Sequence, residues 1–253
     1  MEAVPLGMAK WESFLENHIE GFFNRRFSSS LEPVELEKAL VRELVRCAKD
    51  TPDGRVVPNA YTLTVGADDY TRLCSERVLA DLHAAVERQV IAENYFMDGT
   101  LSIDMKNEGA GKGSLDVTSR FVAADEAAGE KNETTSHTIV LEKTSFARPL
   151  NLPRTYELAS LTAMNGEDRD SYLAIGEQQI YIGRLDKNDF ILMDANVSRL
   201  HAYVAYERHR HVVHDAESTN GTFVNGKPVQ AACLAPGDDI QVGSTVLRYE
   251  VIH

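Results

Sequence analysis

Three short segments in the second half of the sequence carry residue types that could bind an anion with several oxygen atoms. Arg184 offers a guanidinium, Ser198 a short hydroxyl, and Arg199 a second cation or a backbone donor. A phosphorylated side chain brings about 1.5 to 2 negative charges and three strong acceptor oxygens, so these donors suit a phosphate group. Each charge-assisted hydrogen bond contributes on the order of 1.5–3 kcal/mol. The segments are Ile182-Gly183-Arg184, Val197-Ser198-Arg199-Leu200-His201 and Ser218-Thr219-Asn220-Gly221-Thr222-Phe223-Val224-Asn225-Gly226.

The order and spacing of these segments (Gly-Arg, then Ser-Arg-x-His, then Ser-Thr-Asn-Gly-Thr) closely resemble the forkhead-associated (FHA) family over residues 159–253. The resemblance implies a domain that binds phosphothreonine peptides. It implies that Arg184 and Ser198 contact the phosphate directly, with Arg199 beside them. It further implies that Thr219 adds a contact and that Asn220 holds the peptide backbone next to the phosphothreonine.

Other residues of the same segments are expected to support the site. The resemblance implies that His201 stabilises the loop from within, as the corresponding histidine does in the family. Gly183 and Gly221 are expected to serve backbone geometry, because glycine has no side chain to obstruct the chain. Asn225-Gly226 is a strong hairpin-turn signal.

A hydrolase is the competing interpretation of the same region. Ser198, His201 and Asp215 are the residue types of a catalytic triad. Nothing in the sequence resembles a nucleophile elbow such as Gly-x-Ser-x-Gly, and three such residues occur in most chains of this length. We therefore expect a binding protein without a cofactor, and not an enzyme.

Two further segments look at first like phosphate or metal sites. Residues 109–114 contain Gly-Lys, but a Walker motif needs Gly where the chain has Lys106 and Ser or Thr where it has Gly113. A hairpin tip is expected there. Arg208-His209-Arg210-His211, with His214 further on, could bind a metal or extend the anion site. It stands between two strand-like runs, so a solvated turn without metal is expected.

The composition limits the partners and the compartment. The chain has 253 residues, 43% of them hydrophobic, and a formal net charge of −13. A negative charge of this size argues against general nucleic-acid binding. No apolar run reaches the roughly 18 residues of a membrane span, so no membrane insertion is expected. Cys47, Cys74 and Cys233 are odd in number and far apart, which fits neither a disulfide framework nor a metal site. The expected location is cytoplasmic.

The first unit is expected over residues 8–122 as a small α+β domain. Helical spacing of apolar residues predicts helices over 11–23, from Pro33 to about 47, and over 75–94. Alternation predicts strands over 61–65, 101–105 and 115–121, and the last two are expected to form a hairpin around 107–113. Pro33 suits a first helical position. The order is therefore α-α-β-α-β-β.

The last unit, residues 159–253, is expected to be an all-β sandwich. Short apolar runs alternate with Gly, Asn and Asp, which is typical of closely spaced strands and turns. The predicted strands are 161–164, 171–175, 180–182, 190–192, 201–206, 212–214, 222–224, 239–242 and 246–251. The chain as a whole is thus expected to be multidomain.

Between the two units, residues 123–158 are expected to form a flexible, threonine-rich linker. Glu133-Thr134-Thr135-Ser136 resembles the phosphorylation motif of a small FHA regulator family, in which the phosphorylated motif binds its own FHA domain. Thr134, Thr135 and Thr144 are therefore candidate phosphosites. The hypothesis is an intramolecular switch, because a short tether presents its ligand at about millimolar concentration. The alternative is an unmodified linker.

The first unit itself resembles the N-terminal domain of FhaA-type proteins. The segments Leu31–Leu40 and Val56–Tyr61 carry this resemblance. It implies bacterial Ser/Thr kinase signalling, connected with cell-wall synthesis or division. A scaffold or docking surface is the expected role of this unit. A KH-like nucleic-acid module is the second candidate, although the Gly-x-x-Gly loop of that module is missing.

The expected function is therefore that of a phosphothreonine-dependent adaptor. Its expected partners are phosphothreonine proteins, a Ser/Thr kinase and its own phosphorylated linker. The alternative is an FHA-fold scaffold that contacts proteins without phosphate.

Overall fold

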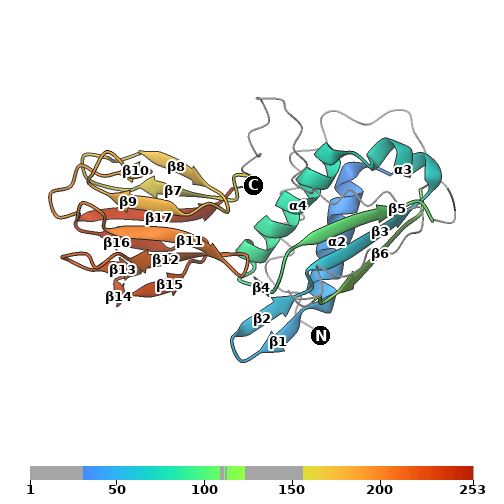
Figure 1. Cartoon of the computed structure of the whole chain (residues 1–253), viewed down its shortest axis with the longest axis horizontal. Coiled ribbons are helices and arrows are strands. Elements are labelled where there is room, and N and C mark those ends of the chain that lie inside the picture. Colours follow the sequence, from blue (N-terminus) through green and yellow to red (C-terminus); the bar gives the residue numbers. More distant parts are fainter. Residues whose placement is uncertain (1–30, 109–110, 112, 123–155, 253) are drawn as a thin grey trace, which may run out of the picture.

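A computed structural model describes residues 31–108, 111, 113–122 and 156–252 of the chain (Figure 1). These residues form an α+β part followed by a sandwich of strands, which confirms the expected fold class. The first predicted helix, 11–23, and the candidate phosphosites Thr134, Thr135 and Thr144 lie outside the described residues.

The α+β part places two helices, α2 and α4, against strands. Helix α2 begins at Pro33, as expected, and buries Leu36, Leu40 and Leu44 completely. Ser75 caps α4, because its Oγ accepts a hydrogen bond from Val78 N at 3.3 Å. The elements are α2 (Pro33–Cys47), β1 (Lys49–Thr51), β2 (Gly54–Val57), β3 (Ala60–Val65), α3 (Ala67–Leu73), α4 (Glu76–Ala92), β4 (Phe96–Met97), β5 (Ser102–Lys106) and β6 (Leu115–Arg120).

The predicted hairpin between the last two strands of this part is wrong. Strand β3 lies between β5 and β6, in the order β5-β3-β6. It pairs in parallel with β5, with Tyr61 opposite Ile103, and antiparallel with β6, with Tyr61 opposite Ser119. Period-2 alternation identifies a strand but not its neighbour. A strand from earlier in the chain has therefore taken the central position.

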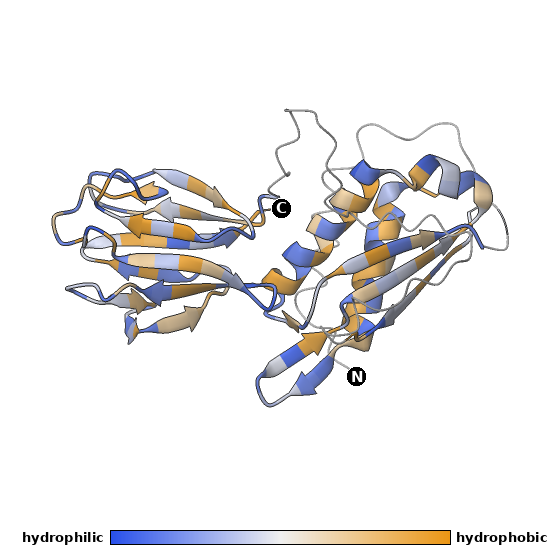
Figure 2. Ribbon diagram, in the orientation of Figure 1, coloured by the Kyte–Doolittle hydropathy of each residue, from blue (hydrophilic) through white to orange (hydrophobic). Residues whose placement is uncertain are grey.

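The sandwich consists of two sheets that enclose one apolar core. The five-stranded sheet has the order β10-β9-β11-β12-β15, and the six-stranded sheet β14-β13-β16-β17-β7-β8. Figure 2 shows apolar and polar residues alternating along these strands, which buries one face of each sheet. The strands are β7 (Ala159–Ala163), β8 (Tyr172–Ile175), β9 (Ile180–Gly183), β10 (Phe190–Ile191), β11 (Ala202–Glu207), β12 (Arg210–Asp215), β13 (Thr222–Val224), β14 (Lys227–Val229), β15 (Ala231–Cys233), β16 (Asp239–Val242) and β17 (Thr245–Val251).

The turn between β11 and β12 packs against the α+β part. Arg208 and His209 both have positive φ angles, 49° and 60°, as in a two-residue hairpin loop of type I′. Arg208 Nε donates to Asp98 Oδ1 at 2.7 Å, and Arg210 Nη2 donates to Asn94 Oδ1 at 2.8 Å. Arg210 and its neighbour His211 are buried. The turn expected at residues 208–211 therefore forms and Arg208 is exposed, but the expected full solvation is wrong, because the side chains of Arg210 and His211 are buried against the other domain and the sandwich core.

Helix α4 supplies part of the opposing surface, and Figure 1 shows one end of this helix close to the sandwich. Ile91 is fully buried and belongs to the apolar core of the sandwich. Glu87, one turn earlier, receives a hydrogen bond from Tyr206 Oη and lies 2.8 Å from His209 Nδ1. His209 Nε2 contacts the carbonyl oxygen of Gly99 at 2.8 Å. The two parts thus share a polar and apolar interface.

Candidate functional site

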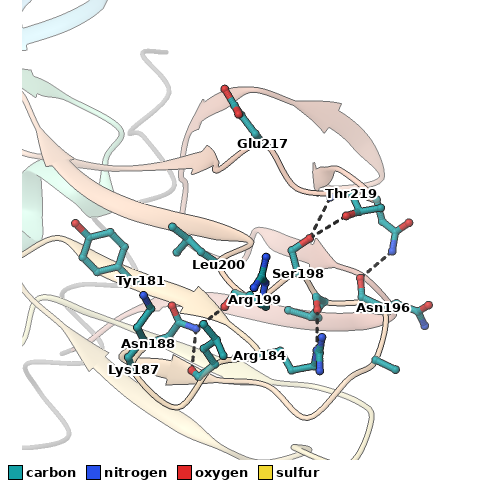
Figure 3. A pocket seen from close by; sticks show the side chains of 14 residues that line it. Tyr181, Arg184, Lys187, Asn188, Asn196, Ser198, Arg199, Leu200, Glu217 and Thr219 are labelled. Carbon is teal, nitrogen blue, oxygen red and sulfur yellow. Dashed lines mark hydrogen bonds between the residues drawn. The ribbon is translucent and has the colours of Figure 1, made fainter.

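The three sequence segments meet at one pocket of about 850 Å³ (Figure 3). It lies where the loops after β9, β10 and β12 converge. Its lining includes three cations, Arg184, Lys187 and Arg199, and one carboxylate, Glu217. The local charge is therefore positive on a chain whose net charge is −13. Of the residues predicted to bind the ligand, Arg184, Ser198, Arg199, Thr219 and Asn220 all line this pocket.

Arg184 stands directly after β9 and joins two of the loops. Its backbone N donates to Ser198 O at 3.0 Å, and its Nε donates to Val197 O at 3.3 Å. Within the described part of the chain, no carboxylate pairs with the Arg184 guanidinium. The remaining guanidinium donors are therefore available to a ligand.

Gly183 lies directly before Arg184 and allows a close approach of the neighbouring loop. A Cβ atom at Gly183 would lie 2.5 Å from the carbonyl oxygen of Arg199 and 2.8 Å from Asn188 Nδ2. Asn188 is buried, and its Nδ2 donates to the carbonyl oxygens of Leu185 and Arg199, each at 2.8 Å. Because Gly183 has no side chain, Asn188 can connect the β9–β10 and β10–β11 loops. Sequence reasoning did not single out Asn188.

Ser198 and Thr219 join the second loop to the third. Thr219 N donates to Ser198 Oγ at 3.0 Å, and the two hydroxyl oxygens lie 3.4 Å apart (Figure 3). Asn220, expected to hold a peptide backbone, donates from Nδ2 to Asn196 O at 2.8 Å. These contacts place two hydroxyl groups and an amide at the edge of the pocket.

His201 lies beneath these loops and is completely buried. Its Nδ1 accepts a hydrogen bond from Ser198 N at 3.1 Å, so Nε2 carries the proton and donates to Gly221 O, also at 3.1 Å. Burial lowers the pKa of His201 below its usual value. Both ring nitrogens thus bind backbone groups. The hydrolase triad does not form, because neither nitrogen contacts the Ser198 hydroxyl or the Asp215 carboxylate.

Asp215 organises the third loop. Ser218 Oγ donates to Asp215 Oδ1 at 2.6 Å, Thr222 Oγ1 donates to the same oxygen at 2.7 Å, and Ser218 Oγ accepts from Gly221 N at 2.9 Å. Burial opposes ionisation of Asp215, but the donors from Ser218 and Thr222 outweigh it, so its pKa is lowered. The local signal was an Asp three residues before a Ser, which favours a turn. Gly221 has a φ of +78° in this turn.

Asp194 fixes the base of the second loop and was also missed. Its Oδ2 accepts from Ser244 N at 2.7 Å and from Ser244 Oγ at 2.6 Å, while its Oδ1 accepts from Asn196 N at 2.8 Å. Burial raises the pKa of Asp194, but these donors outweigh it and lower the pKa to about 2. Asp194 is thus ionised at neutral pH. No short-range pattern could have shown its partner Ser244, which lies far along the chain.

The residues that the structure describes contain no group of three or more His, Cys, Asp or Glu side chains that could hold a metal ion. In the same residues, no helix is long and apolar enough to cross a membrane.

Known families match both parts of the chain. A family model described as the FHA domain matches residues 180–243, and one described as the FhaA N-terminal domain matches residues 8–117. The fold and the site therefore define an FHA-domain protein. More particularly, the chain belongs to the FHA-domain proteins that carry an FhaA N-terminal domain.

Individual relatives match the second part. The glycogen accumulation regulator GarA of Mycobacterium tuberculosis (strain CDC 1551 / Oshkosh) is 38% identical over 85 residues, which are 34% of this chain and 52% of GarA. The oxoglutarate dehydrogenase inhibitor of Corynebacterium glutamicum is 33% identical over 93 residues, which are 37% of this chain and 64% of that protein. The chain spans about half the length of the first of these relatives. Among solved structures, the chain is similar to the FhaA FHA domain in its crystal structure with the intracellular domain of Rv3910. The two sequences are 34% identical, the alignment covers 36% of this chain and 99% of the solved chain, and the TM-score is 0.34.

Proposed function

We propose that this chain is an adaptor that binds phosphothreonine proteins in bacterial Ser/Thr kinase signalling. The proposal is carried by the Arg184 guanidinium, which pairs with no carboxylate of the described residues and lies in one pocket with the Ser198 hydroxyl. A phosphate dianion accepts from a fixed guanidinium and from short hydroxyl donors. The excess of lining cations over the single carboxylate, Glu217, attracts such a ligand further.

The proposed roles of the pocket residues differ. Arg184 and Ser198 bind the phosphate, with Arg199 and Thr219 as further donors. The amide of Asn220, held by Asn196 O, faces the peptide backbone beside the phosphothreonine. His201, Gly183 and Gly221 keep the loops in position. The ligand-binding unit is residues 159–253, joined through the linker 123–158 to the domain 8–122.

A titration with three peptides separates the adaptor from the alternative, an FHA-fold scaffold that acts without phosphate. The peptides have one sequence with phosphothreonine, phosphoserine or threonine at the central position. The adaptor requires tighter binding of the phosphothreonine peptide than of both others. Equal affinity for all three peptides would show that the scaffold describes the protein better.

The curated relatives are named as a regulator and as an inhibitor, which supports a regulatory role and not an enzymatic one. The proposed compartment is the cytoplasm. Cys47, Cys74 and Cys233 are free thiols, as is usual in a reducing compartment.

The linker is a proposed ligand of the same pocket. Thr134, Thr135 and Thr144 lie between the two domains in sequence, so a phosphorylated linker would compete with other proteins at high local concentration. Incubation with a Ser/Thr kinase and mapping of phosphosites tests this switch. Modification of one of the three threonines, followed by weaker binding of an added phosphopeptide, supports it. If all three stay unmodified, there is no switch of this kind.

The N-terminal domain suggests the signalling pathway. Its family resemblance implies a link to cell-wall synthesis or division. Partners captured from a bacterial lysate by the wild-type chain but not by Arg184→Ala would test that link. If none of these partners takes part in either process, the link is wrong.

A further inference from the structure

A groove of about 260 Å³ lies on the α+β part of the chain, between helix α2 and strand β6. Helix α2 contributes Ala39, Arg42 and Arg46 to its lining, and β6 contributes Leu115 and Val117. Strand β6 forms one margin of the three-stranded sheet and pairs only with β3 among the described residues (Figure 1). None of these lining residues belongs to the phosphate pocket, so the groove is a separate surface.

The apolar side chains of β6 are less buried than their partners on the neighbouring strand. Leu63 and Val65 of β3 are completely buried. Val117 and Leu115, which pair with them in register, are only half-buried. Paired residues of neighbouring strands point to the same face of a sheet, so this face is well covered at β3 and incompletely covered at β6. A further apolar element in the groove would remove the remaining apolar surface from water.

The rim of the groove is basic on the α2 side. Arg42 is exposed and forms no ion pair within the described part of the chain. The side chain of Arg46, one turn later, is 71% exposed and pairs with the buried Glu43 at 2.7 Å. Glu43 also accepts from Ser119 Oγ at 2.8 Å, so its charge is compensated within the domain. The β6 side of the rim carries Asp116. An apolar element with acidic residues toward α2 therefore fits the groove.

Residues 11–23 of this chain, which lie outside the described residues, have the matching chemistry. Glu12, Glu16 and Glu20 recur every fourth residue, on one side of the predicted helix. The FhaA N-terminal domain model matches from residue 8 onward, so the segment belongs to the same domain as the groove. The apolar residues of the segment recur at helical spacing and are mostly aromatic: Trp11, Phe14, Leu15, Ile19, Phe22 and Phe23.

The length of the connection keeps this segment close to α2. Leu31 is buried, and its N donates to Asp69 Oδ1 at 3.2 Å, which fixes the chain just before α2 begins. Only residues 24–30 join the segment to this anchor, and short connections of this kind usually link antiparallel neighbouring helices. A helix over 11–23 would be about 20 Å long, close to the roughly 22 Å of α2. The segment can therefore lie along the whole groove.

We propose that residues 11–23 form an amphipathic helix that binds in the groove between α2 and β6. The helix runs antiparallel to α2, and its aromatic face covers Val117. In this direction Glu12 and Glu16 come level with the part of α2 that carries Arg42. The bound helix also shields the edge of β6, which would otherwise be open to pairing with another chain. The groove is thus an intramolecular binding site, and it does not depend on the proposed phosphothreonine binding.

Fluorescence quenching tests the position of the segment, because Trp11 is the only tryptophan of the chain. The proteins are full chains in which the native cysteines are replaced by serine and one new cysteine, Arg42→Cys or Arg77→Cys, carries a nitroxide spin label. Such a label quenches tryptophan emission only at short range. Arg77 is an exposed arginine of α4 that does not line the groove, so its variant is the matched control. Circular dichroism checks that each labelled protein is folded.

The label at Arg42→Cys should quench most of the Trp11 emission, and the label at Arg77→Cys should quench little of it. In both proteins without label, Trp11 should emit at shorter wavelength than in a free peptide of residues 8–24, because the bound indole ring is removed from water.

Two outcomes overturn the proposal. Equal quenching by the two labels would show that the segment does not lie in this groove. Emission of Trp11 at the wavelength of the free peptide would show that the segment is not bound to the domain at all. Either result leaves the proposed phosphothreonine binding untouched, because the groove and the phosphate pocket share no residue.

Discussion

His201 Nδ1 accepts a hydrogen bond from the backbone N of Ser198 at 3.1 Å, so a buried imidazole sets the position of a residue at the pocket edge. The opposite nitrogen donates to Gly221 O in the third loop at 3.1 Å. One side chain therefore connects the β10–β11 loop with the β12–β13 loop. The geometry of the pocket depends on this connection as much as on the residues that face the ligand.

Replacement of His201 tests this role. His201→Ala removes both hydrogen bonds and leaves a cavity, so we expect the free energy of unfolding to fall by about 2–4 kcal/mol. Phosphothreonine affinity should fall as well, because Ser198 and Gly221 lose their common partner. Urea denaturation and peptide titration measure the two effects. A variant with wild-type stability and affinity would show that the histidine is dispensable.

The protonation of His201 and His211 should weaken the sandwich at low pH. Burial lowers the pKa of both, that of His211 to about 4. His211 Nε2 donates to Gly176 O at 2.9 Å, and its Nδ1 accepts from Tyr249 Oη at 2.8 Å. As the pH falls, the unfolded state takes up protons before the folded state does. The stabilisation by the two neutral imidazoles is therefore complete above the ordinary histidine pKa of 6.5, and it is lost as the pH falls through the lower pKa values of the folded state. An NMR titration of the imidazole signals should show both residues less than half protonated at pH 6.5. A signal half-protonated at that pH would contradict the assignment.

The contact between His209 and Glu87 should make the domain interface less stable as the pH rises. Burial opposes protonation of His209, but the hydrogen bond and charge of Glu87, with Gly99 O and the nearby Glu177, outweigh it and raise the pKa. Both nitrogens of His209 face acceptors, so the charged ring fits best. The stabilisation is present below the ordinary pKa of 6.5 and is lost as pH rises through the higher folded value.

The Met97 amide reports on this interface, because its N donates across it to Arg208 O at 3.3 Å. Its hydrogen-exchange protection factor should fall as pH rises, and Glu87→Gln should lower it about tenfold at pH 6. Glu250→Gln, an exposed carboxylate on β17, serves as the control. A protection factor that stays constant with pH and in Glu87→Gln would contradict a role for this ion pair.

A methyl group at Gly183 should damage the pocket. The added Cβ in Gly183→Ala would lie 2.5 Å from Arg199 O and 2.8 Å from Asn188 Nδ2, so the β10–β11 loop must shift. We expect a loss of phosphothreonine affinity of about tenfold or more. Gly226→Ala is the matched control, because its Cβ meets nothing within 4 Å while its φ of +76° is strained. That control should lose about 1 kcal/mol of stability and keep its affinity. Equal affinities of the two variants would refute the close-approach argument.

The sequence carried enough information to locate the site but not to describe its support. Arg184, Ser198 and Thr219 were identified because three motifs coincide in order and spacing, and the structure brings them to one pocket. Asp194 and Asn188 were missed because their partners come from other loops, which local patterns do not show.

The fold was predicted to a similar extent. The helix from Pro33 and the sandwich were correct, while β14 and β15, each only three residues long, were missed because they show no clear alternation. The hairpin between β5 and β6 was wrong because the identity of a strand's neighbour is a property of the whole fold. The burial of Arg210 and His211 was not predicted, because charged and polar residues in a turn are usually exposed. Both side chains are buried by contacts with the other domain and with the sandwich core.

Arg184 is proposed to bind the phosphate of a phosphothreonine peptide. The most direct measurement is calorimetric titration of one peptide, phosphorylated and unphosphorylated, into the wild-type chain, Arg184→Ala and Arg169→Ala. Arg169 is exposed and lies outside the pocket, so its variant removes the same charge elsewhere. We expect phosphorylation to raise affinity at least about a hundredfold in the wild-type chain and in Arg169→Ala, and Arg184→Ala to lose most of this gain. If Arg184→Ala keeps the full effect of phosphorylation, or if the wild-type chain shows none, Arg184 does not bind the phosphate.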